Sequence, residues 1–246
     1  MGLFAKFFAG TLAAALLSSC ASVSVDDLHY SEGAPTAPEE ILLEPFEVVE
    51  GALRVDRAPE DLPEFKKQLA VRMTQELTRR LEKHVAPARE LVAGEKPPRG
   101  NFWLVRGKFL RVNQGSRFLR ATLGLGAGGT KMETSVSVFD LSGKEPRRLV
   151  SFDTTGGSNV TQGIGGVAAF PVSGPMALTS AAHMLDGVRS GISFDTSRTA
   201  KEITAVLNDY LHQHGAIKDK PRLKPKKLTG IPLPAAGSAS AAGTAQ

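Results

Sequence analysis

The chain has 246 residues, of which 41% are hydrophobic and 22% charged, and this length is sufficient for one well-packed domain. Six cations and one anion lie within residues 218–227, a surplus equal to the formal net charge of +5. The remainder of the chain is therefore close to neutral, which argues against a basic face that follows the phosphates of a nucleic acid.

The N-terminus has the parts of a bacterial export signal. Lys6 supplies a positive charge, and the apolar run that follows it is too short to cross a bilayer. Leu17-Ser18-Ser19-Cys20 resembles the lipobox of bacterial lipoproteins, whose cysteine is exposed by cleavage and then acylated. The resemblance implies a signal peptide over residues 1–19 and a lipid anchor at Cys20. The alternative is an ordinary signal peptide with an incidental cysteine.

A lipid anchor accounts for Cys20, which is the only cysteine and excludes a disulfide within the chain. Residues 20–40 lack periodicity and are predicted to be an acylated tether. By analogy with other lipoproteins, Ala21 rather than aspartate after the cysteine implies sorting to the outer membrane. We therefore expect an outer-membrane protein whose domain faces the periplasm.

The predicted domain covers residues 41–217 and begins with a strand and a long helix. The strand is expected over 41–49, with Pro45 making it irregular or placing it at a sheet edge. Asp61 is expected to cap a helix that runs to Val85. Apolar residues recur along that helix at spacings of three and four: Leu62, Phe65, Leu69, Met73, Leu77, Leu81 and Val85.

Three further strands and a second helix follow. Residues 102–112 begin apolar on both faces, which favours a central strand. Residues 132–138 alternate apolar with polar, and a turn then leads to a hairpin partner over 149–155. A capping box at Thr199 and Glu202 predicts a helix that ends before Gly215. Its buried face is expected to comprise Ile203, Val206, Leu207, Tyr210 and Leu211.

The order of these elements predicts an α+β fold, in which helices pack on a mostly antiparallel sheet. The lipoprotein signal precedes this domain, and a tail over residues 218–246 follows it. The tail is basic and then rich in Ala, Gly and Ser, which predicts disorder. A flexible basic arm that touches anionic phosphates or carboxylates is the alternative for its first part.

Two glycine-rich segments, 124–129 and 156–175, interrupt the predicted elements. Gly124-x-Gly126-x-x-Gly129 has the letters of a dinucleotide-binding motif, but a strand follows it where that motif requires a helix. We expect these glycines to allow a sharp turn or close packing instead. A short helix over 176–185 is expected after the second segment.

The stretch over residues 115–130 resembles the core signature of a bacterial lipoprotein family, the domain of unknown function numbered 4410. The shared pattern is Gly115-Ser116, an arginine, a run of alternating glycines, and then an alternating strand that includes Val136-Ser137-Val138-Phe139-Asp140. Asp195-Thr196-Ser197-Arg198-Thr199-Ala200, expected to open the last helix, extends the resemblance. The family implies an envelope lipoprotein with an α/β domain, and it implies no reaction.

Arg117 and Arg120 are candidate anion-binding residues. If their segment is helical, the two guanidinium groups share a face and could hold a phosphate or carboxylate. Two surface arginines, or an ion pair with Asp153 or Asp195, are the alternatives.

No catalytic or metal-binding motif is recognisable. The chain has no nucleophile elbow and no cluster of Cys and His at ligand spacing. His212 and His214 diverge on a helix, and His183 beside Asp186 is more typical of a structural pair. We therefore predict a protein that is not an enzyme and that has no cofactor or bound metal.

The predicted function is a non-enzymatic, lipid-anchored envelope protein that acts as a periplasmic adaptor to an outer-membrane assembly. Its partners would be the membrane, through Cys20, and an envelope protein, with homo-oligomerisation left open. One alternative is an oligomeric lipoprotein that inserts residues 118–129 and 164–178 into the membrane. Another is a binder of small anionic ligands or glycans that uses Arg117 and Arg120.

Overall fold

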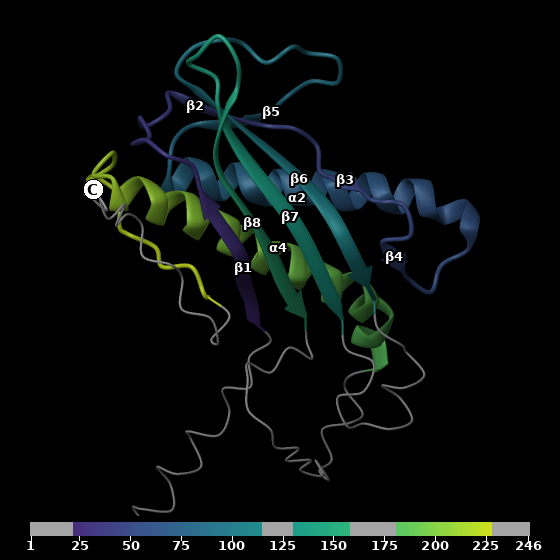
Figure 1. The fold of residues 1–246 in the computed structure, drawn as a ribbon. Helices are drawn as coiled ribbons and strands as arrows, with labels where there is room; N and C mark the ends of the chain where they lie inside the picture. Colours follow the sequence, from purple (N-terminus) through teal and green to yellow (C-terminus); the bar gives the residue numbers. More distant parts are fainter. Residues whose placement is uncertain (1–21, 115–129, 158–180, 228–246) are drawn as a thin grey trace, which may run out of the picture.

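The computed structural model describes residues 22–114, 130–157 and 181–227, and for Ser22 and residues 181–193 it describes the backbone alone. One sheet has two helices, α2 and α4, packed side by side against it (Figure 1). The strands are β1 (Ser22–Tyr30), β2 (Glu40–Leu43), β3 (Glu47–Val48), β4 (Leu53–Arg54), β5 (Ala88–Glu90), β6 (Phe102–Asn113), β7 (Lys131–Asp140) and β8 (Arg147–Gly157). A short 3₁₀ turn (Pro59–Asp61) precedes α2 (Leu62–His84), and α4 covers Ala181–Gln213.

The sheet has the order β1-β8-β7-β6-β2-β5, with β3 and β4 also paired to β6. This confirms an α+β fold, but the prediction of a mostly antiparallel sheet was wrong, because the sheet is mixed. The β1, β8, β7 and β6 pairs are antiparallel, whereas β2, β3 and β4 all run parallel to β6. The physical reason is the crossover through α2, which returns the chain so that β6 runs in the direction of β2.

The predicted strand over residues 41–49 is interrupted at Pro45, as its irregularity led us to expect. β2 pairs with the first half of β6, and β3 resumes at Glu47 opposite Lys108. Phe46 lies in the gap and packs over Gly107, where a Cβ atom would overlap its ring. The glycine in β6 therefore makes room for the phenyl ring that fills the break.

Helix α2 confirms the predicted apolar stripe. Phe65, Leu69, Met73, Leu77 and Leu81 are all buried in the main core. The helix starts differently from the prediction, because the Asp61 side chain makes no capping hydrogen bond. The preceding 3₁₀ turn, which includes Asp61, leads directly into the helix instead.

Strands β6, β7 and β8 confirm the predicted central strand and hairpin. β6 has neighbours on both sides, and the burial of β7 alternates residue by residue from Lys131 to Asp140. The helix-facing residues of β7 and β8 include Val136, Val138, Val150 and Phe152, which join the main core. The long register of this hairpin determines which strand ends meet, as described below.

Strand β1 corrects the prediction of a tether over residues 20–40. Ser22–Tyr30 pairs with β8 along one edge of the sheet, and Val23 and Val25 are buried. The alternation of two valines with Ser24 and Asp26 is short and polar, but pairing with a strand about 130 residues away in sequence is sufficient to order it. The described fold thus begins at Ser22, two residues after Cys20.

Helix α4 corrects the prediction of a last helix that opens at Thr199. It begins at Ala181, so Thr199 lies inside the helix and its hydroxyl faces Met132 Sδ at 3.6 Å. The prediction that Thr199 and Glu202 form a capping box was therefore wrong, because the backbone N–H groups of an interior helical turn are already hydrogen-bonded. The predicted buried face and the C-cap were right: Gly215 has φ +68° and donates its N–H to the His212 carbonyl.

Residues 218–227 correct the prediction of a tail disordered from residue 218. They form an ordered segment along α4, which we call the basic strap. Arg222 binds Asp209 at 2.6 Å, Leu223 N–H binds Asn208 at 2.6 Å, and Lys226 N–H binds Glu202 at 2.8 Å. The strap thus runs back along the helix and reaches β1, where Lys227 forms a parallel bridge with Val25. Residues 228–246 lie outside the described part.

Candidate functional site

Four strand ends meet in one row across the sheet. Ser22 at the start of β1 lies opposite Gly157 at the end of β8, and Gly157 lies opposite Lys131 at the start of β7. Lys131 in turn lies opposite Asn113 at the end of β6. We call this row the strand-end pole; it is the lower end of the sheet in Figure 1. Here the chain enters from Cys20, and here it leaves toward both glycine-rich segments.

Close backbone packing holds the pole together at Gly157. A Cβ atom at this position would overlap the Thr130 carbonyl and approach Lys131. A Cβ at the preceding Gly156 would likewise collide with the Val23 side chain. Part of the glycine content of the predicted 156–175 segment therefore has a local packing role at the junction of β1, β8 and β7.

Charged groups of both signs lie at the pole. Glu133 of β7 is bracketed by Lys131 and Arg111, and it forms an ion pair with each of them. Asp195 of α4 is 1% exposed and interacts with Thr130 and with Arg198, whose guanidinium lies 3.4 Å away. Burial raises the pKa of the Asp195 carboxyl, although Thr130 and Arg198 oppose that shift. Asp195 therefore ties α4 to the start of β7.

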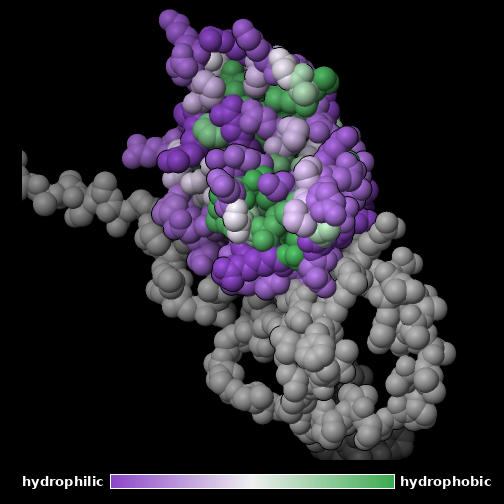
Figure 2. Space-filling view, turned by 90° about the vertical axis from the view of Figure 1, so that its right-hand side faces the viewer, coloured by the Kyte–Doolittle hydropathy of each residue, from purple (hydrophilic) through white to green (hydrophobic). Residues whose placement is uncertain are grey.

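An exposed aromatic ring lies beside this tie. Phe194 is 59% exposed, although phenylalanine is usually buried, and the Arg198 guanidinium lies 5.9 Å from its ring centroid. The other exposed large hydrophobic residues in the described ranges are Tyr30, Val71, Val92 and Leu110. The face in Figure 2 is mostly hydrophilic, with groups of hydrophobic residues showing between hydrophilic ones. Single exposed hydrophobic side chains are common on protein surfaces, so Phe194 is a candidate contact residue only because it lies near the pole.

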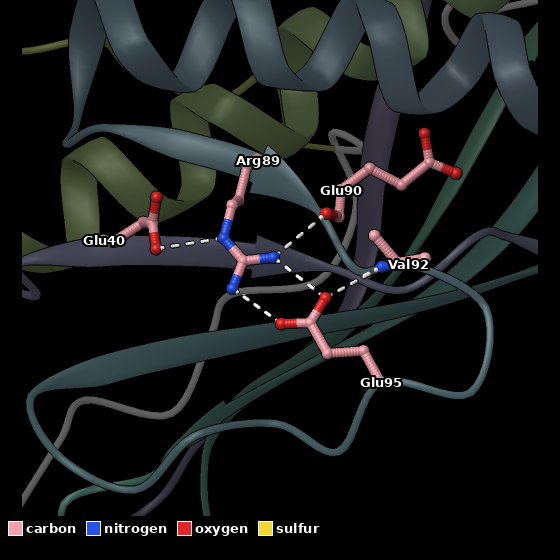
Figure 3. A network of polar contacts seen from close by, with 5 residues as sticks. All are labelled: Glu40, Arg89, Glu90, Val92 and Glu95. Atoms are coloured by element: carbon pink, nitrogen blue, oxygen red, sulfur yellow. Dashed lines mark hydrogen bonds and ion pairs between the residues drawn. The ribbon is translucent and has the colours of Figure 1, made fainter.

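A second polar cluster centres on Arg89 of β5. Its guanidinium donates to both carboxylate oxygens of Glu95, to Glu40 of β2 and to the Glu90 carbonyl (Figure 3). Glu95 also accepts the Val92 N–H. The hydrogen bonds to Glu95 raise the pKa of Arg89, and those same bonds lower the pKa of Glu95.

This Arg89 cluster is best explained as structural. Its donors and acceptors are directed at one another and tie β2, β5 and the loop after β5 into one unit. Beneath that loop lies a small apolar cluster separate from the main core: Leu42, Leu91, Leu104 and Leu141. The cluster therefore holds the loop over apolar side chains rather than offering an open anion site.

The predicted site residues are not tested by this structure. Cys20, Arg117 and Arg120 lie outside the described residues, as do residues 124–129 and 158–175. The side chains of His183 and Asp186 also lie outside them, and Asp195, one suggested partner for the arginines, binds Arg198. In the described ranges, no group of three or more His, Cys, Asp and Glu could hold a metal ion. In the same ranges, no helix is both long enough and apolar enough to span a membrane.

The strand-end pole was not predicted. The sequence placed Asp195 at a helix start and as one possible partner of the two arginines, and it predicted that the strap is disordered. The signal for β1 was the alternation of Val23 and Val25, which is too short to stand out from a tether. No local pattern indicates that Ser22, Asn113, Lys131 and Gly157 share one row, because that row depends on pairing between distant strands.

A family model described as a domain of unknown function (DUF4410) matches residues 18–155, more than half of the chain. No curated protein matches the sequence. Solved structures with a similar chain course include the PelC dodecamer from Paraburkholderia phytofirmans (12% identity, 73% of this chain and 97% of that chain, TM-score 0.33). They also include a hypothetical protein from Chlamydia trachomatis (13% identity, 71% and 98%, TM-score 0.37).

A putative neuraminyllactose-binding hemagglutinin homolog from Helicobacter pylori is similar at the same level (11% identity, 77% of this chain and 98% of that chain, TM-score 0.32). Values this low assign neither a function nor an assembly to this chain.

Proposed function

We propose that this chain, which belongs to the DUF4410 family, is a lipid-anchored bacterial envelope protein. The family membership, the lipobox and the strand-end pole support this proposal. Its domain would serve as a non-enzymatic adaptor that presents the strand-end pole to the membrane and the opposite end to a partner assembly. We further propose that Cys20 carries the acyl chains and that the outer membrane is the site of anchoring, with the domain in the periplasm.

The observation that carries the proposal is the row of strand ends. The described part of β1 starts at Ser22, so the anchor proposed at Cys20 lies two residues along the chain from a paired strand. A lipid so close to a paired strand restricts the domain to orientations in which the pole faces the bilayer. Acylation of this kind anchors a protein stably once two chains are present. Confinement to a surface also raises the effective concentration of the domain near membrane partners.

A second function has support from the same row. Residues 118–129 and 164–178 both belong to segments that leave the sheet at the strand-end pole, between Asn113 and Lys131 and after Gly157. Apolar, glycine-containing segments whose flanking strands end at the pole fit an oligomeric lipoprotein that inserts them into the bilayer. Both candidate functions require the lipid anchor. In the adaptor the pole only faces the membrane, whereas in the inserting oligomer the segments that follow the pole enter it.

Metabolic labelling with an alkyne palmitate in cells tests the anchor. We expect label on the wild-type chain, no label on Cys20→Ala, and normal label on the matched control Ser19→Ala, which keeps a small residue before the cysteine. Absence of label on the wild-type chain, or label that survives Cys20→Ala, would contradict the proposal.

Crosslinking in the same cells separates the two functions. An adaptor should yield one reproducible envelope partner that is lost with Cys20→Ala. A ladder of crosslinked copies of this chain alone, resistant to extraction from membranes by salt, would favour the inserting oligomer instead.

A further inference from the structure

Helix α4 presents three outward residues on one face as it leaves the strand-end pole. Phe194, Arg198 and Lys201 follow one another at spacings of four and three, which places them on the same side of the helix. Phe194 and Lys201 are exposed, and the Arg198 side chain is 39% exposed. An aromatic ring is thus followed by two cations along about two turns of helix.

The carboxylates of the same stretch are turned inward. Asp195 is 1% exposed and binds Thr130 and Arg198, and Glu202 is 4% exposed and accepts the backbone N–H of Lys226. The negative charges are therefore withdrawn from the surface while the cations remain on it. A sequence count of charges conceals this separation.

The basic strap adds three lysines beside this face. Within the strap, Arg222 pairs with Asp209, and Lys220 donates to the Glu82 carbonyl, so both have structural roles. Lys224, Lys226 and Lys227 have exposed side chains. Burial raises the pKa of the Glu202 carboxyl, and the nearby Lys201 and Lys226 oppose that shift.

We propose that this α4–strap face, made of Phe194, Arg198, Lys201, Lys224, Lys226 and Lys227, binds the anionic headgroups of a phospholipid bilayer. The inference rests on the proposed function for its orientation, because Lys227 bridges to Val25, three residues from Ser22 at the strand-end pole. Arg198 is already paired with Asp195, and two exposed carboxylates, Asp26 and Asp27, follow Val25 in β1, but the four lysines of the face outnumber those two. Cations near an anionic leaflet add attraction that salt weakens, and an exposed ring favours the boundary between headgroups and acyl chains.

Vesicle flotation with an unlipidated chain tests this face without help from the anchor. The mature chain, residues 20–246, retains every described strand and helix, and Cys20→Ser removes the acylation site. We expect this protein to float with phosphatidylcholine vesicles that contain phosphatidylglycerol, and to stay behind with vesicles of phosphatidylcholine alone. Each lysine contributes about a fivefold gain in partitioning, so K201Q/K224Q/K226Q should lower partitioning about a hundredfold.

Matched variants decide whether the face or the net charge is responsible. Lys66, Lys96 and Lys144 are also exposed and lie on other parts of the molecule, so K66Q/K96Q/K144Q removes the same charge. We expect this control to retain most of the binding and Phe194→Ala to lose part of it. Equal loss in the two triple variants, or no preference for phosphatidylglycerol, would overturn the inference. Because no acyl chain is present, such a result would leave the palmitate labelling of Cys20 unaffected.

Discussion

Tyr30 and Tyr210 are the only tyrosines of the chain, and their rings stack with centroids 5.0 Å apart and planes 8° apart. Tyr210 also contacts Trp103 of β6 at 6.2 Å and His214 at 4.8 Å between ring centroids. These contacts join the edge strand β1, the helix α4 and the central strand β6 at the end of the sheet opposite the strand-end pole. Aromatic pairs of this kind contribute beyond the area they bury.

Alkaline titration should reveal this cluster. Tyr30 is partly covered where its ring stacks on Tyr210, and this partial burial, with the nearby Asp209 carboxylate, raises its pKa to about 12; burial also raises the pKa of Tyr210. We expect little phenolate absorbance near pH 10 from the native protein, and in guanidinium about half of the full signal at the same pH. The native state retains protons that the unfolded chain releases, so stability should fall as the pH rises from 10 toward 12. Native ionisation near pH 10 would contradict this, and Tyr30→Phe isolates the contribution of Tyr210.

The position of the basic strap against α4 depends on the buried side-chain amide of Asn208. Asn208 of α4 donates to the His84 carbonyl at 2.7 Å and to the Pro221 carbonyl at 3.2 Å, and it accepts the Leu223 N–H at 2.6 Å. It therefore joins the C-terminal end of α2 to the strap. A buried side chain that makes three hydrogen bonds is costly to lose, because its partners are left unsatisfied.

Removal of this amide should destabilise the fold. Asn208→Ala is expected to lower the free energy of unfolding by about 2–4 kcal/mol, measured by urea denaturation, because buried backbone groups lose their partners. Gln68→Ala is the control, since it removes an exposed amide of α2 that donates to Glu64, and it should cost less than about 0.5 kcal/mol. Equal effects from the two variants would show that Asn208 does not secure the strap.

The elements that could be predicted from sequence are those with a long local period. The stripe of α2 and the alternation of β7 are repeated often enough to exclude other structures, and both are confirmed. Strand β1 and the strap could not be predicted, because their order comes from partners far along the chain, such as Thr155 for Ser24 and Glu202 for Lys226. The capping box failed for the opposite reason: a local motif at Thr199 has no effect inside a helix that already extends from Ala181.

The candidate site shows the same division. The lipobox is a local signal and leads to Cys20, whereas the strand-end pole is a property of sheet register. Arg117 and Arg120 were proposed from spacing alone, and they lie outside the described residues. The cations that the structure does bring together lie on α4 and on the strap, a segment predicted to be disordered, and no spacing rule could reveal that the two are close.

The two ends of the sheet differ in the chain segments that they carry. The strand-end pole carries the chain entry from Cys20, whereas the turn from β7 to β8, residues 141–146, lies at the far end of the same two strands. An anchored protein should therefore shield one end of the sheet and expose the other. Lys131 at the pole and Lys144 in the far turn are suitable positions to compare, because neither side chain is buried.

Thiol accessibility on intact membranes tests this orientation. With Cys20 acylated, Lys131→Cys and Lys144→Cys each introduce the single free thiol of the chain. We expect a bulky polyethylene-glycol maleimide to modify Lys144→Cys rapidly and Lys131→Cys several-fold more slowly, because the bilayer blocks its approach to the pole. In detergent the two rates should converge, which controls for the local environment of Lys131 beside Glu133. Equal rates on membranes would mean that the domain swings freely on its anchor, and an adaptor that depends on a membrane-facing pole would then be untenable.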